Sequence, residues 1–209
     1  MLTSFENRED AANLLAVKLM QYRGRNPLIL AIPRGAVPMG KILAEQLQGE
    51  LDVVLVRKIG APGNPEYAIG AVDESGWVYL TEAAEMMGVS HAYIEQEKRR
   101  QVEICKMRRK QYTPIKPPVD PAGRVVIVID DGLATGATMI AALHAVRAKK
   151  PAELVCAVPV AASDSLEKIK PIADSVVCLM VPSFFMAVGQ FYRNFSQVED
   201  EEVEKILSE

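Results

Sequence analysis

The feature of this 209-residue chain that most restricts its fold is a set of five short, unbroken apolar runs, at 28–32, 53–56, 125–129, 154–160 and 176–181. A strand with one solvated face alternates apolar and polar residues, so these runs indicate strands buried on both faces. Segments of helical period lie between most of them, near 36–48, 137–149 and 163–170, and another covers about 7–22. This alternation predicts an α/β fold: a doubly wound, mainly parallel sheet flanked by helices.

Two stretches interrupt the alternation. Residues 62–80 contain two prolines and three glycines, which predict a β-hairpin excursion rather than a central strand. Residues 90–112 predict a polar helix in which seven basic and three acidic side chains leave a charge of +4, a pattern typical of a solvated helix face. We expect a single domain over 1–209, with a flap over 60–82 and a small hood from 182–195.

Composition excludes several classes of protein. A formal net charge of −3 argues against a dedicated binder of nucleic acids or membrane surfaces, which usually carries a strong basic excess. The three cysteines form no Cys-x-x-Cys pair, so zinc and redox motifs are absent. An acidic N-terminal segment and the lack of any apolar stretch of membrane-spanning length predict a cytoplasmic protein.

The sharpest motif follows the run 125–129 and reads Asp130-Asp131-Gly132-Leu133-Ala134-Thr135-Gly136-Ala137-Thr138. Ligands of doubly wound sheets bind beyond the carboxyl ends of the strands, which is where this loop falls. The first backbone N–H groups of the next helix have no partner within that helix and suit a phosphate, and Gly136 permits close approach. The loop therefore predicts a site for a phosphorylated ligand.

Asp130 and Asp131 do not suit the phosphate itself, because like charges repel. They suit vicinal hydroxyls, which donate hydrogen bonds to carboxylates, or a Mg²⁺ ion that bridges to other oxygens. A sugar phosphate with a cis-diol satisfies both halves of the motif. The chain has neither a GxxxxGK[ST] nor a GxGxxG sequence, so the common nucleotide loops do not compete. We expect both carboxylates to face solvent and to be dispensable for folding.

This stretch resembles the type I phosphoribosyltransferase family, in which an apolar strand, two acids and a TG-containing loop bind phosphoribosyl pyrophosphate (PRPP). The resemblance implies that Asp130 and Asp131 contact the ribose hydroxyls, hold Mg²⁺ and take part in catalysis. It also implies that the 5′-phosphate is bound by the loop residues Ala134, Thr135, Gly136, Ala137 and Thr138.

Two further strand ends resemble the places where the family binds pyrophosphate. Arg34-Gly35 follows the first run, where family members often place a basic residue, a glycine and a strained or cis peptide. Arg57 and Lys58 follow the run 53–56 and resemble the family's second loop. We expect Arg34 and Lys58 to stabilise the leaving pyrophosphate and Gly35 and Arg57 to contact the substrate. The alternatives are a turn with an exposed arginine and a cation that caps the sheet edge.

The acceptor pocket is the part of the chain that matches least. Hypoxanthine and guanine enzymes of the family carry an acid inside the phosphate loop, where this chain has Ala134, and this disfavours a 6-oxopurine. In the expected hood, Phe184, Phe185 and Tyr192 offer stacking surfaces for a planar base, although they equally suit closure of the core. The tail 196–209, with six acids and one lysine, predicts a solvated terminal helix.

The resemblance implies a Mg²⁺-dependent phosphoribosyltransferase of nucleotide salvage. Such an enzyme passes the ribose 5-phosphate of PRPP to a nitrogen nucleophile, here a nucleobase, and releases pyrophosphate. The alternative is a non-catalytic PRPP-sensing regulator of nucleotide metabolism, which only the +4 segment favours. We expect a homodimer whose partners are PRPP and a small-molecule acceptor, with no nucleic acid and no membrane.

Overall fold

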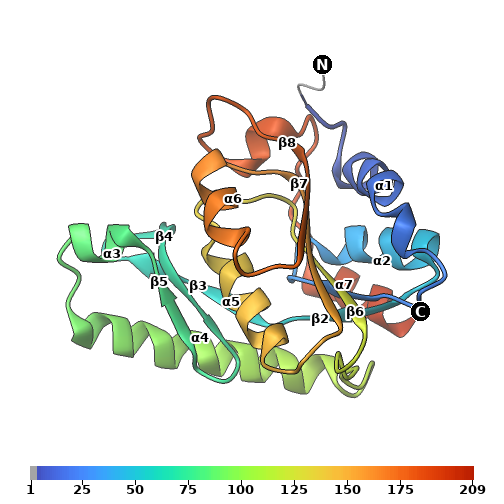
Figure 1. The fold of residues 1–209 in the computed structure, drawn as a ribbon. Coiled ribbons are helices and arrows are strands. Elements are labelled where there is room, and N and C mark those ends of the chain that lie inside the picture. Colours follow the sequence, from blue (N-terminus) through green and yellow to red (C-terminus); the bar gives the residue numbers. More distant parts are fainter. Residues whose placement is uncertain (1–3) are drawn as a thin grey trace.

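The computed structural model describes residues 4–209, which form two separate sheets (Figure 1). The larger sheet has five parallel strands in the order β2-β1-β6-β7-β8, so the predicted doubly wound α/β fold is confirmed. The chain runs outward in one direction from β1 to β2 and in the other from β6 to β8. Ligands bind where the strand order reverses, which here lies between β1 and β6. The strands are Leu28–Ala31 (β1), Glu50–Val53 (β2), Val125–Ile129 (β6), Glu153–Val160 (β7) and Ser175–Met180 (β8).

Helices cover both faces of this sheet, which explains the absence of alternation in the strand sequences. Ile29 of β1 packs into the core cluster that includes α1 and α2, whereas Leu28 packs into the cluster that includes α5. Among the described residues, no helix is both long and apolar enough to cross a membrane. The helices around the sheet are α1 (Arg8–Lys18), α2 (Val37–Leu47), α5 (Ala137–Arg147) and α6 (Ser163–Ile169), with short 3-10 turns at Met20–Tyr22 and Val188–Phe191.

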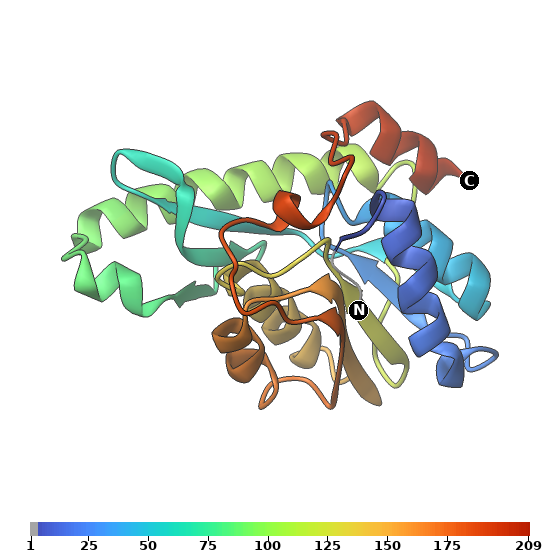
Figure 2. The same ribbon diagram turned by 90° about the horizontal axis from the view of Figure 1, so that it is seen from above.

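The second sheet is an antiparallel excursion that extends away from the five-stranded sheet (Figures 1 and 2). The predicted hairpin is confirmed as β4–β5, and β3 joins it as a third strand. A small cluster of its own, which includes Ile59, Ile69 and Val72, packs against the helices that follow it in sequence. The excursion consists of β3 (Val56–Ala61), β4 (Asn64–Asp73), β5 (Val78–Leu80), α3 (Glu82–Met86) and α4 (His91–Tyr112).

The prediction of a strand at 53–56 was wrong. That run joins two strands: β2 ends at Val53 and β3 begins at Val56, so Arg57 and Lys58 lie within a strand rather than after one. The polar Glu50 and Asp52 concealed the start of β2. Asp52 is 3% exposed, and its carboxylate accepts hydrogen bonds from the N–H groups of Val53 and Val119, which is how a buried acid is accommodated in this strand.

The terminal helix is shorter and more buried than expected. It spans Asp200–Ser208 (α7), and its Val203 and Leu207 are buried in the core cluster that also contains α1 and α2. Val203 and Leu207 are four positions apart, so they face the same side of the helix. The many acids of the tail made this apolar side easy to overlook in the sequence.

Candidate functional site

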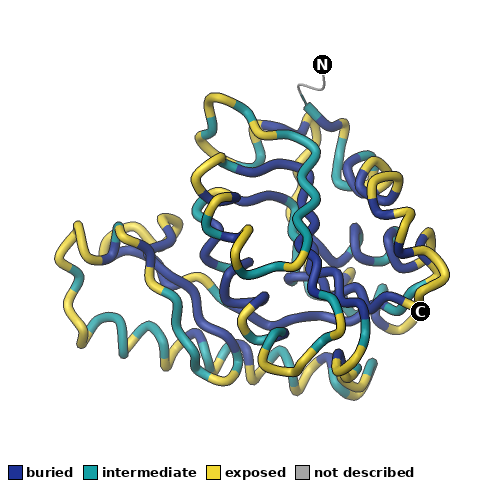
Figure 3. The backbone as a smooth tube through the Cα atoms, in the orientation of Figure 1, coloured by how far each residue is buried: buried dark blue, intermediate teal, exposed yellow. Residues whose placement is uncertain are grey.

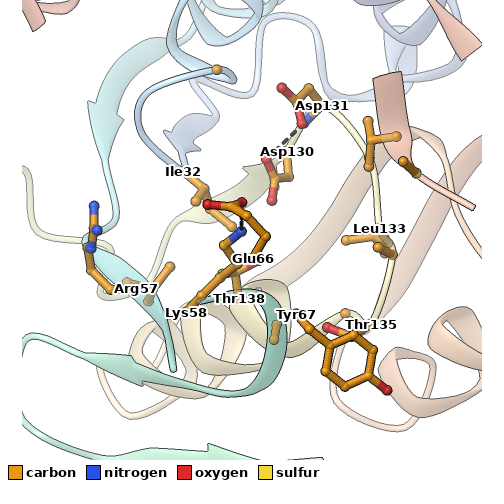
Figure 4. A pocket seen from close by; sticks show the side chains of 18 of the residues that line it. Ile32, Arg57, Lys58, Glu66, Tyr67, Asp130, Asp131, Leu133, Thr135 and Thr138 are labelled. Carbon is orange, nitrogen blue, oxygen red and sulfur yellow. Dashed lines mark hydrogen bonds and ion pairs between the residues drawn. The ribbon is translucent and has the colours of Figure 1, made fainter. Parts of the chain in front are cut away.

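A cavity of about 640 Å³ lies at the carboxyl ends of β1 and β6 and extends beneath the second sheet. Strand–loop–helix units supply its floor, and β3 and β4 supply a wall (Figure 4). The volume falls in the range of small-molecule sites. The lining residues that concern the site are Gly35, Arg57, Lys58, Glu66, Tyr67, Asp130, Asp131, Ala134, Thr135, Gly136, Thr138 and Met186.

The loop 134–138 forms the turn into α5. Gly136, with φ of +75°, is the N-cap residue of the helix, and this left-handed conformation favours glycine. The Ser165 hydroxyl donates a hydrogen bond of 2.5 Å to the Ala134 carbonyl oxygen, which fixes the loop from α6. Ala137 is buried and does not line the cavity, whereas Thr138 does. The helix N-terminus therefore opens toward the cavity, as an anion site requires.

Asp130 and Asp131 directly follow β6 at the floor of the cavity, and the Asp131 N–H donates a hydrogen bond of 2.9 Å to Asp130 Oδ1. Burial raises the pKa of Asp130 well above its usual value, and the neighbouring Asp131 carboxylate raises it further. Burial also raises the pKa of Asp131, against the opposing effect of the Arg8 guanidinium. A part-buried acid pair of this kind gains stability when a cation or hydroxyl donors approach it.

The expectation that both acids face solvent was wrong for Asp131, whose side chain is only 16% exposed. That both acids are dispensable for folding stays a prediction. Arg8 Nε and Nη2 donate hydrogen bonds of 3.0 and 2.8 Å to Asp131 Oδ2, so this carboxylate joins α1 to the end of β6. Tyr192 also donates a 2.6 Å hydrogen bond from its hydroxyl to the Asp131 carbonyl oxygen. A carboxylate with these partners contributes to the fold as well as to the cavity.

The turn after β1 has the backbone expected from the resemblance, but its arginine does not face the cavity. The Pro33–Arg34 peptide bond is cis, and Gly35 lines the cavity. Arg34 Nη1 instead lies 3.1 Å from Glu199 Oε2 and 3.3 Å from Asp200 Oδ2, at the start of α7. Its expected place at a pyrophosphate would require these ion pairs to open.

Arg57 and Lys58 on β3 both line the cavity (Figure 4). Lys58 Nζ lies 3.1 Å from Glu66 Oε2 of β4, a pair with 45% and 88% of the two side chains exposed. Arg57 Nε donates a 2.9 Å hydrogen bond to Gln101 Oε1, and burial lowers its pKa, with a further contribution from Arg108. The wall therefore presents two cations. Arg57 is held by its hydrogen bond to Gln101, whereas Lys58 is held only by an exposed ion pair.

The expected aromatic stacking surface in the hood is not found. Phe184 is 70% exposed and does not line the cavity, Phe185 packs on Phe191 with 5.1 Å between ring centroids, and Tyr192 is buried with its hydroxyl on Asp131. These aromatics close the core or face outward, because the segment after β8 pairs through Tyr192 with Phe5, just before α1.

The cavity and its surroundings include residues that sequence reasoning missed. Tyr67 supplies the aromatic ring that the hood was expected to supply, Glu66 pairs with Lys58, and Met186 lines the cavity from the hood segment. The proline-rich and glycine-rich stretch 62–80 marked the hairpin but not which of its side chains face inward. Arg8 carried no signal, because a basic residue at the start of a helix is ordinary.

The donor set of the site suits a Mg²⁺ ion shared with a phosphorylated ligand, although it does not form a complete metal cage. Among the described residues, no group of three or more His, Cys, Asp or Glu side chains is placed to hold a metal. Mg²⁺ usually keeps waters and takes one or two carboxylates together with substrate phosphates. Asp130, whose carboxylate is part-buried beside a second acid, fits that role.

A comparison with protein families and curated proteins identifies the type of domain. The family model described as "Phosphoribosyl transferase domain" matches residues 1–196. Two Mycobacterium tuberculosis proteins, each named "Putative phosphoribosyl transferase", are 38% identical to the chain over 206 residues. The alignment covers 97% of the chain and 46% of each of those proteins, so the chain spans about half the length of these curated relatives.

Solved structures agree in fold. The crystal structure of the protein TT1426 from Thermus thermophilus is 44% identical, with a TM-score of 0.80 and 98% of each chain covered. A hypoxanthine phosphoribosyltransferase from Staphylococcus aureus is 14% identical, with a TM-score of 0.50 over 87% of this chain and 78% of that one. At that identity the second likeness concerns the fold alone.

Proposed function

The chain belongs to the phosphoribosyl transferase family, and from that premise we propose that it transfers the ribose 5-phosphate of PRPP to a nitrogen nucleophile. In this reaction the bond from the anomeric carbon to pyrophosphate breaks, a bond to the acceptor nitrogen forms, and the configuration inverts. The observation that carries the proposal is the meeting of an acid pair, a helix-opening Thr-Gly-Ala-Thr loop and two cations in one cavity of about 640 Å³.

The floor of the cavity suits the ribose 5-phosphate. The N-terminus of α5, opened by Gly136, offers backbone N–H groups to the 5′-phosphate, and the Thr135 and Thr138 side chains line the same surface. Asp130 at the end of β6 suits the ribose hydroxyls, which donate hydrogen bonds to a carboxylate. These groups hold the sugar while its anomeric carbon gains positive charge.

The wall formed by β3 suits the leaving group. Negative charge grows on pyrophosphate as its bond to the sugar breaks, so cations aimed at it stabilise the transition state more than the bound substrate. Lys58 and Arg57 line this side of the cavity. Lys58 can leave Glu66 for a phosphate oxygen at little cost in free energy, because an exposed ion pair contributes little to stability. Arg34 joins them only when it leaves Glu199 and Asp200.

A Mg²⁺ ion bound with PRPP would be held by the Asp130 carboxylate, and Asp131 would be the neighbouring acid. Such an ion neutralises charge that develops on the pyrophosphate oxygens. Burial raises the pKa of Asp130 because it disfavours the charged carboxylate. A cation bound beside this carboxylate would offset that cost.

For the acceptor we propose a nucleobase, which would make this a nucleotide-forming enzyme of salvage. Tyr67, Met186 and Val188 are among the residues that line the cavity, and an aromatic ring together with apolar side chains suits a planar base. Ala134 leaves the phosphate loop without the acid expected for a 6-oxopurine, which favours other bases.

The regulatory alternative loses part of its support. Two of the basic side chains of α4 that suggested nucleic-acid binding pair with acids outside the helix: Arg109 lies 2.9 Å from Glu74, and Arg108 lies 3.9 Å from Asp200. Charges neutralised in this way make a weak electrostatic footprint for a nucleic acid.

The test is release of pyrophosphate from PRPP and Mg²⁺ with a panel of nucleobases. We expect one or a few bases to support release, and the Asp130→Asn variant to lose it. The Arg193→Met variant serves as the control, because Arg193 is exposed and pairs with Glu6 away from the cavity. Binding of PRPP without release for any base would favour the regulator, and absence of binding would contradict both functions.

A further inference from the structure

Arg8 and Asp131 lie 123 positions apart in sequence and form an ion pair at the edge of the cavity. Arg8 Nε and Nη2 both donate to the same carboxylate oxygen, Asp131 Oδ2, at 3.0 and 2.8 Å. Only 13% and 16% of the two side chains are exposed, so solvent screens this pair little. Two charge-assisted hydrogen bonds on one oxygen hold that oxygen in place and balance the charge of the carboxylate.

Arg8 is itself fixed on its remaining sides. Its Nη1 donates a 2.6 Å hydrogen bond to the Ser196 carbonyl oxygen, and its guanidinium carbon lies 3.9 Å from the ring centroid of Phe195. The same C-terminal segment supplies Tyr192, whose hydroxyl donates to the Asp131 carbonyl oxygen. The two ends of the chain therefore meet at Asp131.

The turn after β1 packs against this pair. A Cβ atom on Gly35 would overlap Asp131 Oδ2 and would lie 3.2 Å from Arg8 Nη2. Gly35 itself lines the cavity, so the Arg8–Asp131 pair packs directly against the turn that carries Arg34. The pair therefore contacts the turn after β1 as well as the loop after β6.

Asp130 contrasts with its neighbour. Within residues 4–209 no ion pair reaches its carboxylate, which instead accepts a hydrogen bond from the Asp131 N–H. The acid pair is therefore unequal: the charge of Asp131 is balanced within the protein, and that of Asp130 is not.

We propose that Arg8 is a positioning residue of this site, which fixes and neutralises the Asp131 carboxylate so that Asp130 alone presents an unpaired charge to the ligand. This role rests on the proposed function, because the ligand is taken to be PRPP with Mg²⁺. Arg8 acts through Asp131 and does not touch the substrate.

The first test compares PRPP binding in the presence of Mg²⁺ for the wild type, Arg8→Met, Arg8→Lys and the surface control Arg193→Met. We expect Arg8→Met to weaken binding on the order of 10- to 100-fold, as loss of a group that orients a ligand-binding carboxylate does. Arg8→Lys keeps the charge but replaces the two-nitrogen contact with a single nitrogen. Its rescue should be partial, with an affinity between those of Arg8→Met and the wild type.

Two results would overturn the proposal. One is an Arg8→Met variant that binds PRPP like the wild type. The other is an Arg8→Lys variant that binds PRPP no better than Arg8→Met, because loss of structure alone would give equal losses in both.

A double-mutant cycle guards against simple misfolding. In the Asp131→Asn background, Arg8→Met should cost nothing further in PRPP affinity, because the partner through which Arg8 acts is already changed. The double variant also lacks the unpaired buried charge of Arg8→Met, so it should fold even where the single variant does not. Additive losses would show that Arg8 acts elsewhere.

The cycle also separates the two proposals. The coupling between Arg8 and Asp131 appears in the free energy of unfolding, which is measured without PRPP. Failure of the wild type to bind PRPP would therefore contradict the proposed function while the coupling stands. Binding by the wild type without coupling would contradict the role of Arg8 alone.

Discussion

The two sheets contribute to the cavity in opposite ways. At the end of β6, Asp131 is held by Arg8, and the loop that follows is fixed by the Ser165 hydroxyl on Ala134. On the antiparallel excursion, the first four residues of β4, Asn64 to Tyr67, are exposed, and Lys58 is held by one surface ion pair (Figure 3). One region is fixed by buried contacts and the other is held loosely.

This difference matches what each region has to do in the proposed reaction. A sugar phosphate must be held in one geometry, which favours groups fixed before it binds. A leaving pyrophosphate must enter, gain charge and depart, and segments that move in such steps come from the less stable parts of a protein. The comparison therefore predicts that changes at β6 alter binding and that changes at β3 alter turnover.

The largest contrast should appear in amide hydrogen exchange. The amides of β6, buried between two parallel neighbours, should exchange only on global unfolding, whereas those of 62–67 should exchange almost freely. The difference should amount to several kcal/mol of protection. Mass spectrometry of the exchanged protein measures it, and similar protection in both regions would remove the basis of the comparison.

Asp130→Asn should have the next largest effect. Loss of a charged hydrogen-bond acceptor costs about 1.5–3 kcal/mol, so the affinity for PRPP with Mg²⁺ should fall by roughly 10- to 150-fold. Calorimetric titration measures the change, with Arg193→Met as the matched control. Unchanged affinity would remove Asp130 from the ligand site.

The same variant should not lose stability at neutral pH. Because burial raises the pKa of Asp130 above the ordinary 3.8, the folded protein holds its proton more tightly than the unfolded chain. This contribution to stability is present below the unfolded pKa and is lost as pH rises through the folded pKa. Denaturant unfolding near pH 7 should give Asp130→Asn a free energy of unfolding no lower than that of the wild type.

Lys58→Ala should lower kcat by about tenfold, or about 1.4 kcal/mol, with a smaller change in the affinity for PRPP. The charge it faces grows only as the glycosidic bond breaks, so its contribution belongs to the transition state. Comparison of kcat and KM with the best base of the panel measures the split, with Lys106→Ala on α4 as the control. Equal turnover in the variant and the wild type would place Lys58 outside the chemistry.

Asp200→Asn should have the smallest effect. Its carboxylate is 39% exposed and shares Arg34 with Glu199, so the free energy of unfolding should fall by no more than about 1 kcal/mol. If this pairing holds Arg34 away from PRPP, the variant should bind PRPP a few-fold more tightly. Weaker binding would indicate instead that α7 positions Arg34 for the ligand.

Sequence pattern was sufficient for four strands of the larger sheet, β1, β6, β7 and β8, which match the runs 28–32, 125–129, 154–160 and 176–181. The alternation of these runs with helices placed the loop 134–138 beyond a strand end. The run 53–56 misled because Asp52 at the end of β2 is both charged and buried. Its carboxylate is satisfied by the backbone of Val119, a contact that no local pattern reveals.

The sequence by itself determined the α/β class, the hairpin excursion and the residues of the acid pair and its loop, because strand, turn and helix preferences are local. Tertiary structure alone decided which partners those residues have. Arg8 meets Asp131 across 123 positions, Arg34 turns to α7, and Tyr67 rather than the hood aromatics lines the cavity. The physical reason is that the direction and charge balance of a side chain depend on elements distant in sequence, which only the packed fold brings together.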